Sequence, residues 1–176
     1  MTTSSFVLRL GGALLLAGLV AACQGRPADA PPTTNKLYSA MLNGVLHESV
    51  PFVSVARLRQ QPAPVLLDTR TPEEFAVSHL RGARWVGYDK FSLAEVQHIP
   101  KSAPIVVYCS VGVRSEKIGT RLKQAGFTNV RNLYGGIFEW VNEGQPVVTA
   151  DNQPTDRVHA YSPAWGIWLQ RGQKVY

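Results

Sequence analysis

A cysteine stands where an apolar segment of the chain gives way to a loop of small residues. Residues 105–108 read IVVY, a short apolar run typical of a strand that is buried on both faces. A helical pattern begins at residue 115 and ends at Gly126. The segment that joins the two contains one potential nucleophile and its neighbours: Cys109, Ser110, Val111, Gly112, Val113, Arg114 and Ser115.

These residue types at this spacing can activate a thiol and bind negative charge in the same place. Gly112 permits the left-handed backbone that a tight turn often needs. Successive N–H groups at the start of a helix point into one concavity, where the helix dipole and Arg114 add positive potential. A thiol in that environment loses its proton more readily, and the thiolate is the nucleophile. Cys109 is therefore the candidate catalytic residue, and residues 110–115 are the candidate cradle for the group it receives.

The elements that must position this loop alternate between strands and helices. Apolar runs predict strands at residues 50–55, 64–68, 83–86, 105–108 and 130–133. Helical patterns lie between them, at residues 37–46, 56–61, 115–125 and 136–142, and a further helix begins with Thr71 as its cap. Such alternation predicts an α/β fold with a parallel sheet that helices cover on both faces. Ligands of these sheets bind outside the carboxyl ends of the strands, which is where Cys109 stands.

The composition is that of one globular domain. The chain has 176 residues, of which 45% are hydrophobic and 17% charged, and its formal net charge is +6. Two cysteines exclude a disulfide-stapled scaffold, and the composition excludes collagen and wholesale disorder. Lysine and arginine do not cluster, so no nucleic-acid partner is expected.

The N-terminus has the features of a targeting segment. Residues 10–22 are uncharged and apolar, which is too short for a comfortable membrane span and fits a secretory signal peptide better than a buried helix or an anchor. The sequence Val-Ala-Ala-Cys that ends at Cys23 resembles the lipobox of bacterial lipoproteins. That resemblance implies removal of residues 1–22, lipidation of Cys23 and a periplasm-facing place at the cell envelope, with ordinary secretion as the alternative. In enteric bacteria, an aspartate directly after the lipidated cysteine resembles a signal for retention in the inner membrane. Because this position is Gln24, the outer membrane is the expected location.

Three blocks of sequence resemble the rhodanese family of sulfurtransferases. The first is the loop CSVGVRS at residues 109–115, preceded by its hydrophobic strand. The second is LDTRTPEEF at residues 67–75, followed by HLRGA at 79–83. The third is NLYGGIFEW at residues 132–140, followed by GQPV at 144–147. The blocks stand in the family's order over residues 50–148.

The resemblance implies a single rhodanese-like domain over residues 37–148, with a central parallel five-stranded sheet and helices on both faces. Residues 23–36, rich in proline, alanine and threonine, are then a flexible tether from the lipid. The implied activity is that of a thiosulfate:cyanide sulfurtransferase in which Cys109 carries the sulfur as a persulfide. The chain is expected to be a monomer that needs no metal or organic cofactor.

The expected partners are small sulfur-containing anions, or persulfides of proteins or small molecules. Because the interior of the loop is apolar apart from Arg114, the sequence does not favour thiosulfate over a persulfide as the native donor. A second interpretation keeps the domain but makes it a low-turnover persulfide carrier, or a docking or sensor module. Phosphatases and arsenate reductases place five residues between cysteine and arginine, whereas four separate Cys109 from Arg114, so a smaller ring suited to one sulfur atom is expected.

Four polar residues outside the loop have a structural and a functional interpretation. They are Asp68, Arg70, Glu74 and His79. Asp68 and Arg70 could contact substrate, but an ion pair at the end of a strand is favoured. Glu74 in a first helical turn offsets the helix dipole, and His79 could be an acid or base but fits a hydrogen bond that anchors a turn.

Residues 149–176 form a tail beyond the family's usual end, with tyrosines, tryptophans and a histidine at high density. The favoured interpretation is that these rings pack on the domain. The alternative is a docking surface or a wall over the site.

Overall fold

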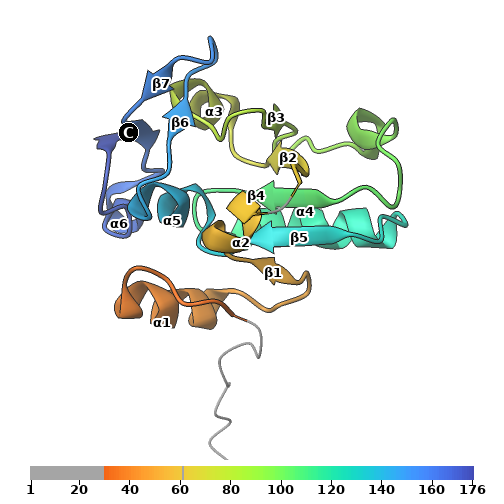
Figure 1. Ribbon diagram of the computed structural model, residues 1–176, viewed down its shortest axis with the longest axis horizontal. Helices are drawn as coiled ribbons and strands as arrows, with labels where there is room; N and C mark the ends of the chain where they lie inside the picture. The colour runs from red at the N-terminus through yellow and green to blue at the C-terminus, as the bar shows by residue number, and fades with distance from the viewer. Residues whose placement is uncertain (1–29, 61) are drawn as a thin grey trace, which may run out of the picture.

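The strands form the parallel five-stranded sheet expected from the sequence, which confirms the fold class. The computed structural model describes residues 30–60 and 62–176. The strand order is β1(Phe52–Val53), β5(Val130–Leu133), β4(Ile105–Tyr108), β2(Val65–Asp68) and β3(Arg84–Trp85), and all the pairings are parallel (Figure 1). All four residues of the central strand β4 are buried. Because β4 is the central strand, Cys109 lies directly after its carboxyl end, in the middle of the edge where the parallel strands end.

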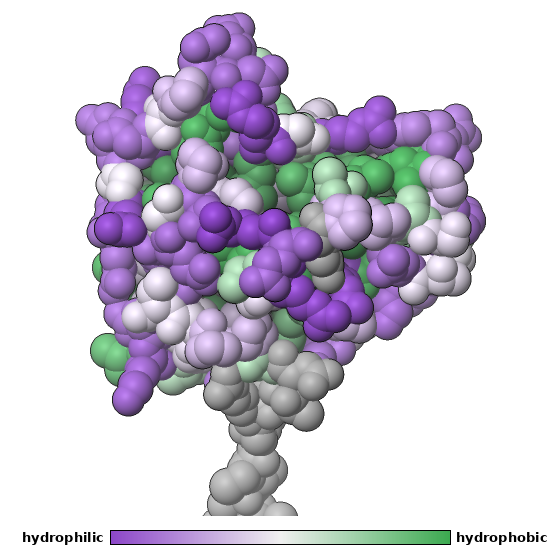
Figure 2. Space-filling view, in the orientation of Figure 1, coloured by the Kyte–Doolittle hydropathy of each residue, from purple (hydrophilic) through white to green (hydrophobic). Residues whose placement is uncertain are grey.

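Helices pack on both faces of the sheet. They are α1(Lys36–Val45), α2(Val55–Gln60), α3(Pro72–Val77), α4(Val113–Gln124) and α5(Gly136–Asn142), with a 3-10 helix at Leu93–Val96. Along β4, Ile105 and Val107 join one hydrophobic cluster with Ile118 of α4. Val106 and Tyr108 join another, which contains residues of α1, α2 and α5. Hydrophilic residues make up most of the face shown in Figure 2, and hydrophobic ones show between them.

Several boundaries differ from those predicted by one or two residues, and two of these differences have a local reason. Helix α4 begins at Val113 rather than residue 115, because the Gly112 carbonyl accepts the first helical hydrogen bond, from the N–H of Glu116 at 3.0 Å. Strand β1 is shorter than predicted because Ser54 caps α2, with its hydroxyl accepting from the N–H of Arg57 at 3.1 Å. The last residues of the predicted cradle are thus the first turn of α4.

The aromatic tail packs on the domain. Its elements are the antiparallel pair β6(Val147–Val148) and β7(Pro154–Thr155), the parallel pair β8(Arg157–His159) and β9(Gln173–Val175), and α6(Pro163–Gly166). They lie beside α5 and α3, at the blue end of the ribbon in Figure 1. Trp168 stacks on Tyr38 with ring centroids 5.5 Å apart, and its carbonyl accepts from the Asn142 amide at 2.9 Å.

The predicted signal peptide, residues 1–22, and the lipidation site Cys23 lie outside the described residues and stay predictions. The end of the predicted tether is docked on the domain: Asn35 caps α1, and the Thr34 N–H and hydroxyl donate to the Glu139 carboxylate. In residues 30–60 and 62–176, none of the helices has the length and apolar character needed to cross a bilayer.

Candidate functional site

The sulfur of Cys109 lies at the N-terminus of α4 and accepts a hydrogen bond. The donor is the N–H of Gly112, 3.1 Å from Sγ, and Gly112 has φ 121°, a conformation that favours glycine. The Gly112 carbonyl accepts from the Ser115 hydroxyl at 3.1 Å and from the Asn132 amide at 2.9 Å. Since the C=O and N–H of a trans peptide point in opposite directions, these bonds turn the next N–H, that of Val113, away from Asn132.

Helix α5 holds the other side of the loop. The N–H groups of Ile137 and Phe138 donate to the carbonyls of Cys109 and Ser110 at 2.9 and 3.1 Å. These carbonyls therefore face the start of α5, and the N–H groups of the same peptides point away from it. The close approach requires Gly136: a Cβ there would lie 2.4 Å from the Cys109 oxygen, and its φ is +57°.

Gly136→Ala is expected to lower the free energy of unfolding and to slow any reaction at Cys109. A matched control is Gly82→Ala, where φ is +78° but no atom lies within 4 Å of the added Cβ. Gly82→Ala should lower the free energy of unfolding only by the strain of a left-handed alanine, about 1–2 kcal/mol. Gly136→Ala should lower it by about 1–3 kcal/mol more, because the loop carbonyls must also move. Urea unfolding measures both values. Equal costs for the two variants would contradict the packing argument.

An ionic cluster joins α3 to the loop. Arg114 donates to both carboxylate oxygens of Glu74 at 2.7 Å and to the Ser110 hydroxyl at 3.0 Å, and that hydroxyl donates to Glu74 at 2.9 Å. Thr71 and Glu74 form a capping box at the start of α3, which orients the carboxylate. Burial lowers the pKa of Arg114, but the hydrogen bonds that it donates to Glu74 and the negative charges of Cys109 and Glu74 raise it above the ordinary value. Arg114 therefore stays charged, and its guanidinium is paired with the Glu74 carboxylate.

The same cluster predicts a loss of stability in acid. Burial raises the pKa of Glu74, but the Arg114 guanidinium and the Thr71 N–H lower it to about 2, from an ordinary value of 4.5. Because the folded-state pKa is depressed, the stabilisation is present above about pH 4.5 and lost as the pH falls towards about 2. Glu74→Gln should be less stable than the unchanged chain at about pH 6, with the difference shrinking by about pH 3. Urea unfolding at several pH values measures it, and a constant difference would contradict the assignment.

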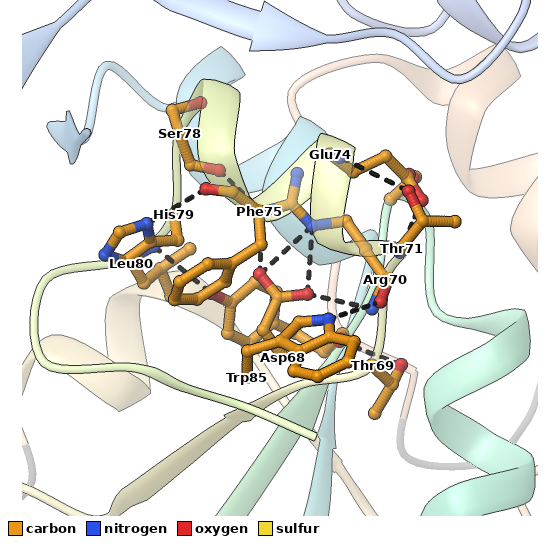
Figure 3. Close-up of polar contacts among 12 residues, drawn as sticks. Asp68, Thr69, Arg70, Thr71, Glu74, Phe75, Ser78, His79, Leu80 and Trp85 are labelled. Atoms are coloured by element: carbon orange, nitrogen blue, oxygen red, sulfur yellow. Dashed lines mark hydrogen bonds and ion pairs between the residues drawn. The ribbon is translucent and has the colours of Figure 1, made fainter. Parts of the chain in front are cut away.

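Asp68 and Arg70 form a fully buried ion pair beneath the start of α3 (Figure 3). Nε of Arg70 lies 3.0 and 3.1 Å from the two carboxylate oxygens, and Nη2 donates to one of them and to the Ser78 carbonyl, both at 2.6 Å. Neither residue of the pair lines the cavity that Cys109 faces. The pair fixes the chain between β2 and α3 and does not contact the sulfur site.

His79 joins α3 to β6. Its Nδ1 lies 3.1 Å from the Phe75 carbonyl, and its ring stacks on that of Phe75 with centroids 3.9 Å apart (Figure 3). Its backbone N–H and C=O both pair with Val148 at 2.9 Å. The ring is thus engaged in packing and a turn, and it is not among the residues around Cys109.

Cys109 is only 1% exposed, yet it borders a cavity of about 140 Å³. The cavity is lined by four of the predicted cradle residues and by two residues of the tail: Ser110, Val111, Val113, Arg114, Tyr161 and Trp165. The Tyr161 ring lies over the Arg114 guanidinium, 5.1 Å from centroid to Cζ. Tyr161 and Trp165 are among the residues that give the tail its aromatic density in the sequence, where packing on the domain was the favoured interpretation and a wall over the site the alternative. These two rings border the cavity at Cys109.

A second, wider cleft of about 630 Å³ adjoins the first, and Arg114 and Tyr161 line both. In the described part of the chain, no three His, Cys, Asp or Glu side chains are grouped so that they could hold a metal ion. The arrangement at Cys109 supplies a thiol, a backbone donor on its sulfur and a neighbouring cation, which is what nucleophilic chemistry at sulfur needs.

Comparison with known proteins places this site in a family. The model of the rhodanese-like domain matches residues 53–143. A sulfurtransferase of Allochromatium vinosum is 34% identical over 95 residues, which are 54% of this chain and 88% of that protein. The probable adenylyltransferase/sulfurtransferase MoeZ of Mycobacterium tuberculosis is 34% identical over 82 residues, and the chain spans only 21% of its length. The solved rhodanese-like domain of an Anabaena protein superposes with a TM-score of 0.52 at 26% identity, covering 56% of this chain and 79% of that domain. This chain therefore belongs to the rhodanese-like domain family.

Proposed function

We propose that the protein is a sulfurtransferase that carries a sulfane sulfur as a persulfide on Cys109. The observation that carries the proposal is the hydrogen bond from the Gly112 N–H to Sγ, at the edge of a cavity large enough for a small donor. A backbone donor and the helix N-terminus favour a negatively charged sulfur over a neutral one. The names of the related sulfurtransferases support the same chemistry.

The transfer takes two displacements at sulfur. The Cys109 thiolate attacks the outer sulfur of the donor, the S–S bond of the donor breaks, and its electron pair leaves with the departing group, which is sulfite when the donor is thiosulfate. Cys109 then holds the sulfur as a persulfide anion. A thiophilic acceptor, cyanide or a thiol, attacks the outer sulfur and releases the Cys109 thiolate again.

The low exposure of Cys109 favours a second candidate function, a persulfide carrier of low turnover. A sulfur that is almost fully buried and borders a cavity with aromatic walls exchanges slowly with bulk reagents. The two functions share the persulfide and differ in the rate at which it is passed on, so multiple-turnover kinetics separates them.

The proposal is tested by the mass of the protein after incubation with a donor. Purified full-length chain, treated with thiosulfate or with a polysulfide, should gain the mass of one sulfur atom, located on the peptide that contains Cys109. Cyanide should remove that mass and yield thiocyanate. No gain with either donor, or a gain located on another peptide, would overturn the proposal.

A further inference from the structure

We propose that the tail residues Tyr161 and Trp165 select the sulfur donor, favouring a sulfane-sulfur compound with an apolar body and a single charge over the thiosulfate dianion. This inference rests on the proposed function. It concerns residues outside the part of the chain, 53–143, that the family model matches. It therefore describes a property of this chain's own tail.

The tail holds both rings at fixed places. Strand β8 pairs with β9, and Val158 and Ala160 are fully buried, so the segment leading to Tyr161 is anchored in the core. Tyr161 has a left-handed φ of 65°, and its N–H donates to Nδ1 of His159 at 3.0 Å. The turn that follows begins α6, in which Trp165 packs against the hydrophobic cluster on the same face of the sheet.

The charge around the sulfur disfavours a dianion. Among the residues that the structure describes, Arg114 is the only cationic one that lines the cavity, and its Nη1 and Nη2 each lie 2.7 Å from a Glu74 carboxylate oxygen. The Tyr161 ring lies over the guanidinium, and the Arg114 side chain is only 18% exposed. A thiolate at Cys109 adds a further negative charge. Because the cost of taking an ion out of water rises with the square of its charge, a dianion enters this cavity far less readily than a monoanion.

The size and lining of the cavity suit a small apolar group. Its volume is about 140 Å³, and an apolar cavity of about 150 Å³ binds benzene. Val111, Val113 and Trp165 provide apolar contacts around it, and an aromatic wall stabilises an aromatic guest by stacking or edge contacts. A donor with a body the size of a benzene ring therefore fits.

Benzenethiosulfonate is a suitable probe, because it reacts as thiosulfate does. The Cys109 thiolate attacks its outer sulfur, the bond between that sulfur and the sulfonyl sulfur breaks, and the electron pair leaves with benzenesulfinate. Thiosulfate gives the same persulfide and releases sulfite. The two donors thus differ in body and charge while forming the same product on the protein.

The test compares kcat/KM for the two donors, with cyanide as the acceptor, in the full-length chain and two variants. The unchanged chain should prefer benzenethiosulfonate by at least about tenfold, and Trp165→Ala should reduce that preference about tenfold. Ile167→Ala is the matched control in the same segment, since Ile167 is 62% exposed and does not line the cavity. A preference for thiosulfate, or a preference that Trp165→Ala leaves unchanged, would overturn the inference.

A binding measurement separates this inference from the proposed function. Benzenesulfonate has no transferable sulfur, and calorimetry should show that it binds Cys109→Ser more tightly than sulfate does, and that it binds a Trp165→Ala form of that variant more weakly. Such binding without sulfur transfer in the unchanged chain would support the selectivity of the cavity and overturn the proposed function. Sulfur transfer with no preference between the donors would overturn the selectivity alone.

Discussion

Cys109→Ser should abolish persulfide formation and reduce thiocyanate release from a sulfur donor and cyanide to the background rate, a loss of at least about a thousandfold. A serine hydroxyl is not ionised at neutral pH and cannot form the S–S bond that holds the transferred sulfur. The backbone donor of Gly112 and the Arg114 cation would remain, but they have no nucleophile to stabilise. Thiocyanate release and the intact mass of the protein after donor treatment measure the two losses.

The chain offers a matched control in its other cysteine. Cys23→Ser removes the other of the two cysteines and should leave sulfur transfer by the purified protein unchanged. Thermal unfolding should show that Cys109→Ser is folded, since serine fills nearly the same volume at a site already bordered by a cavity. If Cys109→Ser retained activity, or if Cys23→Ser lost it, the transferred sulfur would be carried elsewhere.

The place of Cys109 could be predicted because its signals are local. A short apolar run, a glycine and an arginine within six residues, and a helical pattern beyond them are all read from adjacent positions. The rule that ligands bind at the carboxyl ends of parallel strands then needs only the alternation of strands and helices. The start of α4 was predicted two residues late, because glycine without a side-chain cap carries little of the usual signal for a helix start.

The contacts that hold the loop could not be predicted, because they join residues far apart in the chain. Glu74 lies 40 residues from Arg114, and the pairing of β2 with β4 brings the start of α3 beside the loop. The sequence explained Glu74 by the helix dipole alone, whereas the structure gives it Arg114 and Ser110 as partners. The helix cap at Thr71 could be predicted from the sequence. The orientation of the start of α3 relative to the loop could not, because it depends on how α3 packs on the sheet.

The tail shows the same limit. Its aromatic density favoured packing on the domain, and Trp168 against Tyr38 does this. In the alternative interpretation, the tail forms a wall over the site. Whether it does so depends on the position of α6, and this position follows from the burial of β8 and its pairing with β9. In the structure the two interpretations describe different residues of one segment, because Tyr161 and Trp165 border the cavity at Cys109.

Asp68→Asn should lower the free energy of unfolding by about 3–5 kcal/mol, because it leaves a buried guanidinium without its counter-charge. Burial lowers the pKa of Arg70, but Asp68 raises it above the ordinary value, so Arg70 is charged in the folded chain. Its Nη1 has no hydrogen-bond partner within the described residues, and Asp68 is the carboxylate to which the guanidinium donates. Urea unfolding at neutral pH measures the loss.

The double variant Asp68→Asn, Arg70→Met separates the cost of an unpaired charge from that of a lost contact. Asparagine keeps an oxygen for the residue 70 N–H, which donates to Asp68 at 2.9 Å, and methionine fills much of the arginine's volume without charge. Replacing a buried pair with uncharged groups is often neutral, whereas removing one partner is not. The double variant should therefore be more stable than Asp68→Asn alone, although it carries one change more. A double variant less stable than the single one would mean that the shape of the Arg70 side chain, packed beneath α3, matters more than the balance of charge.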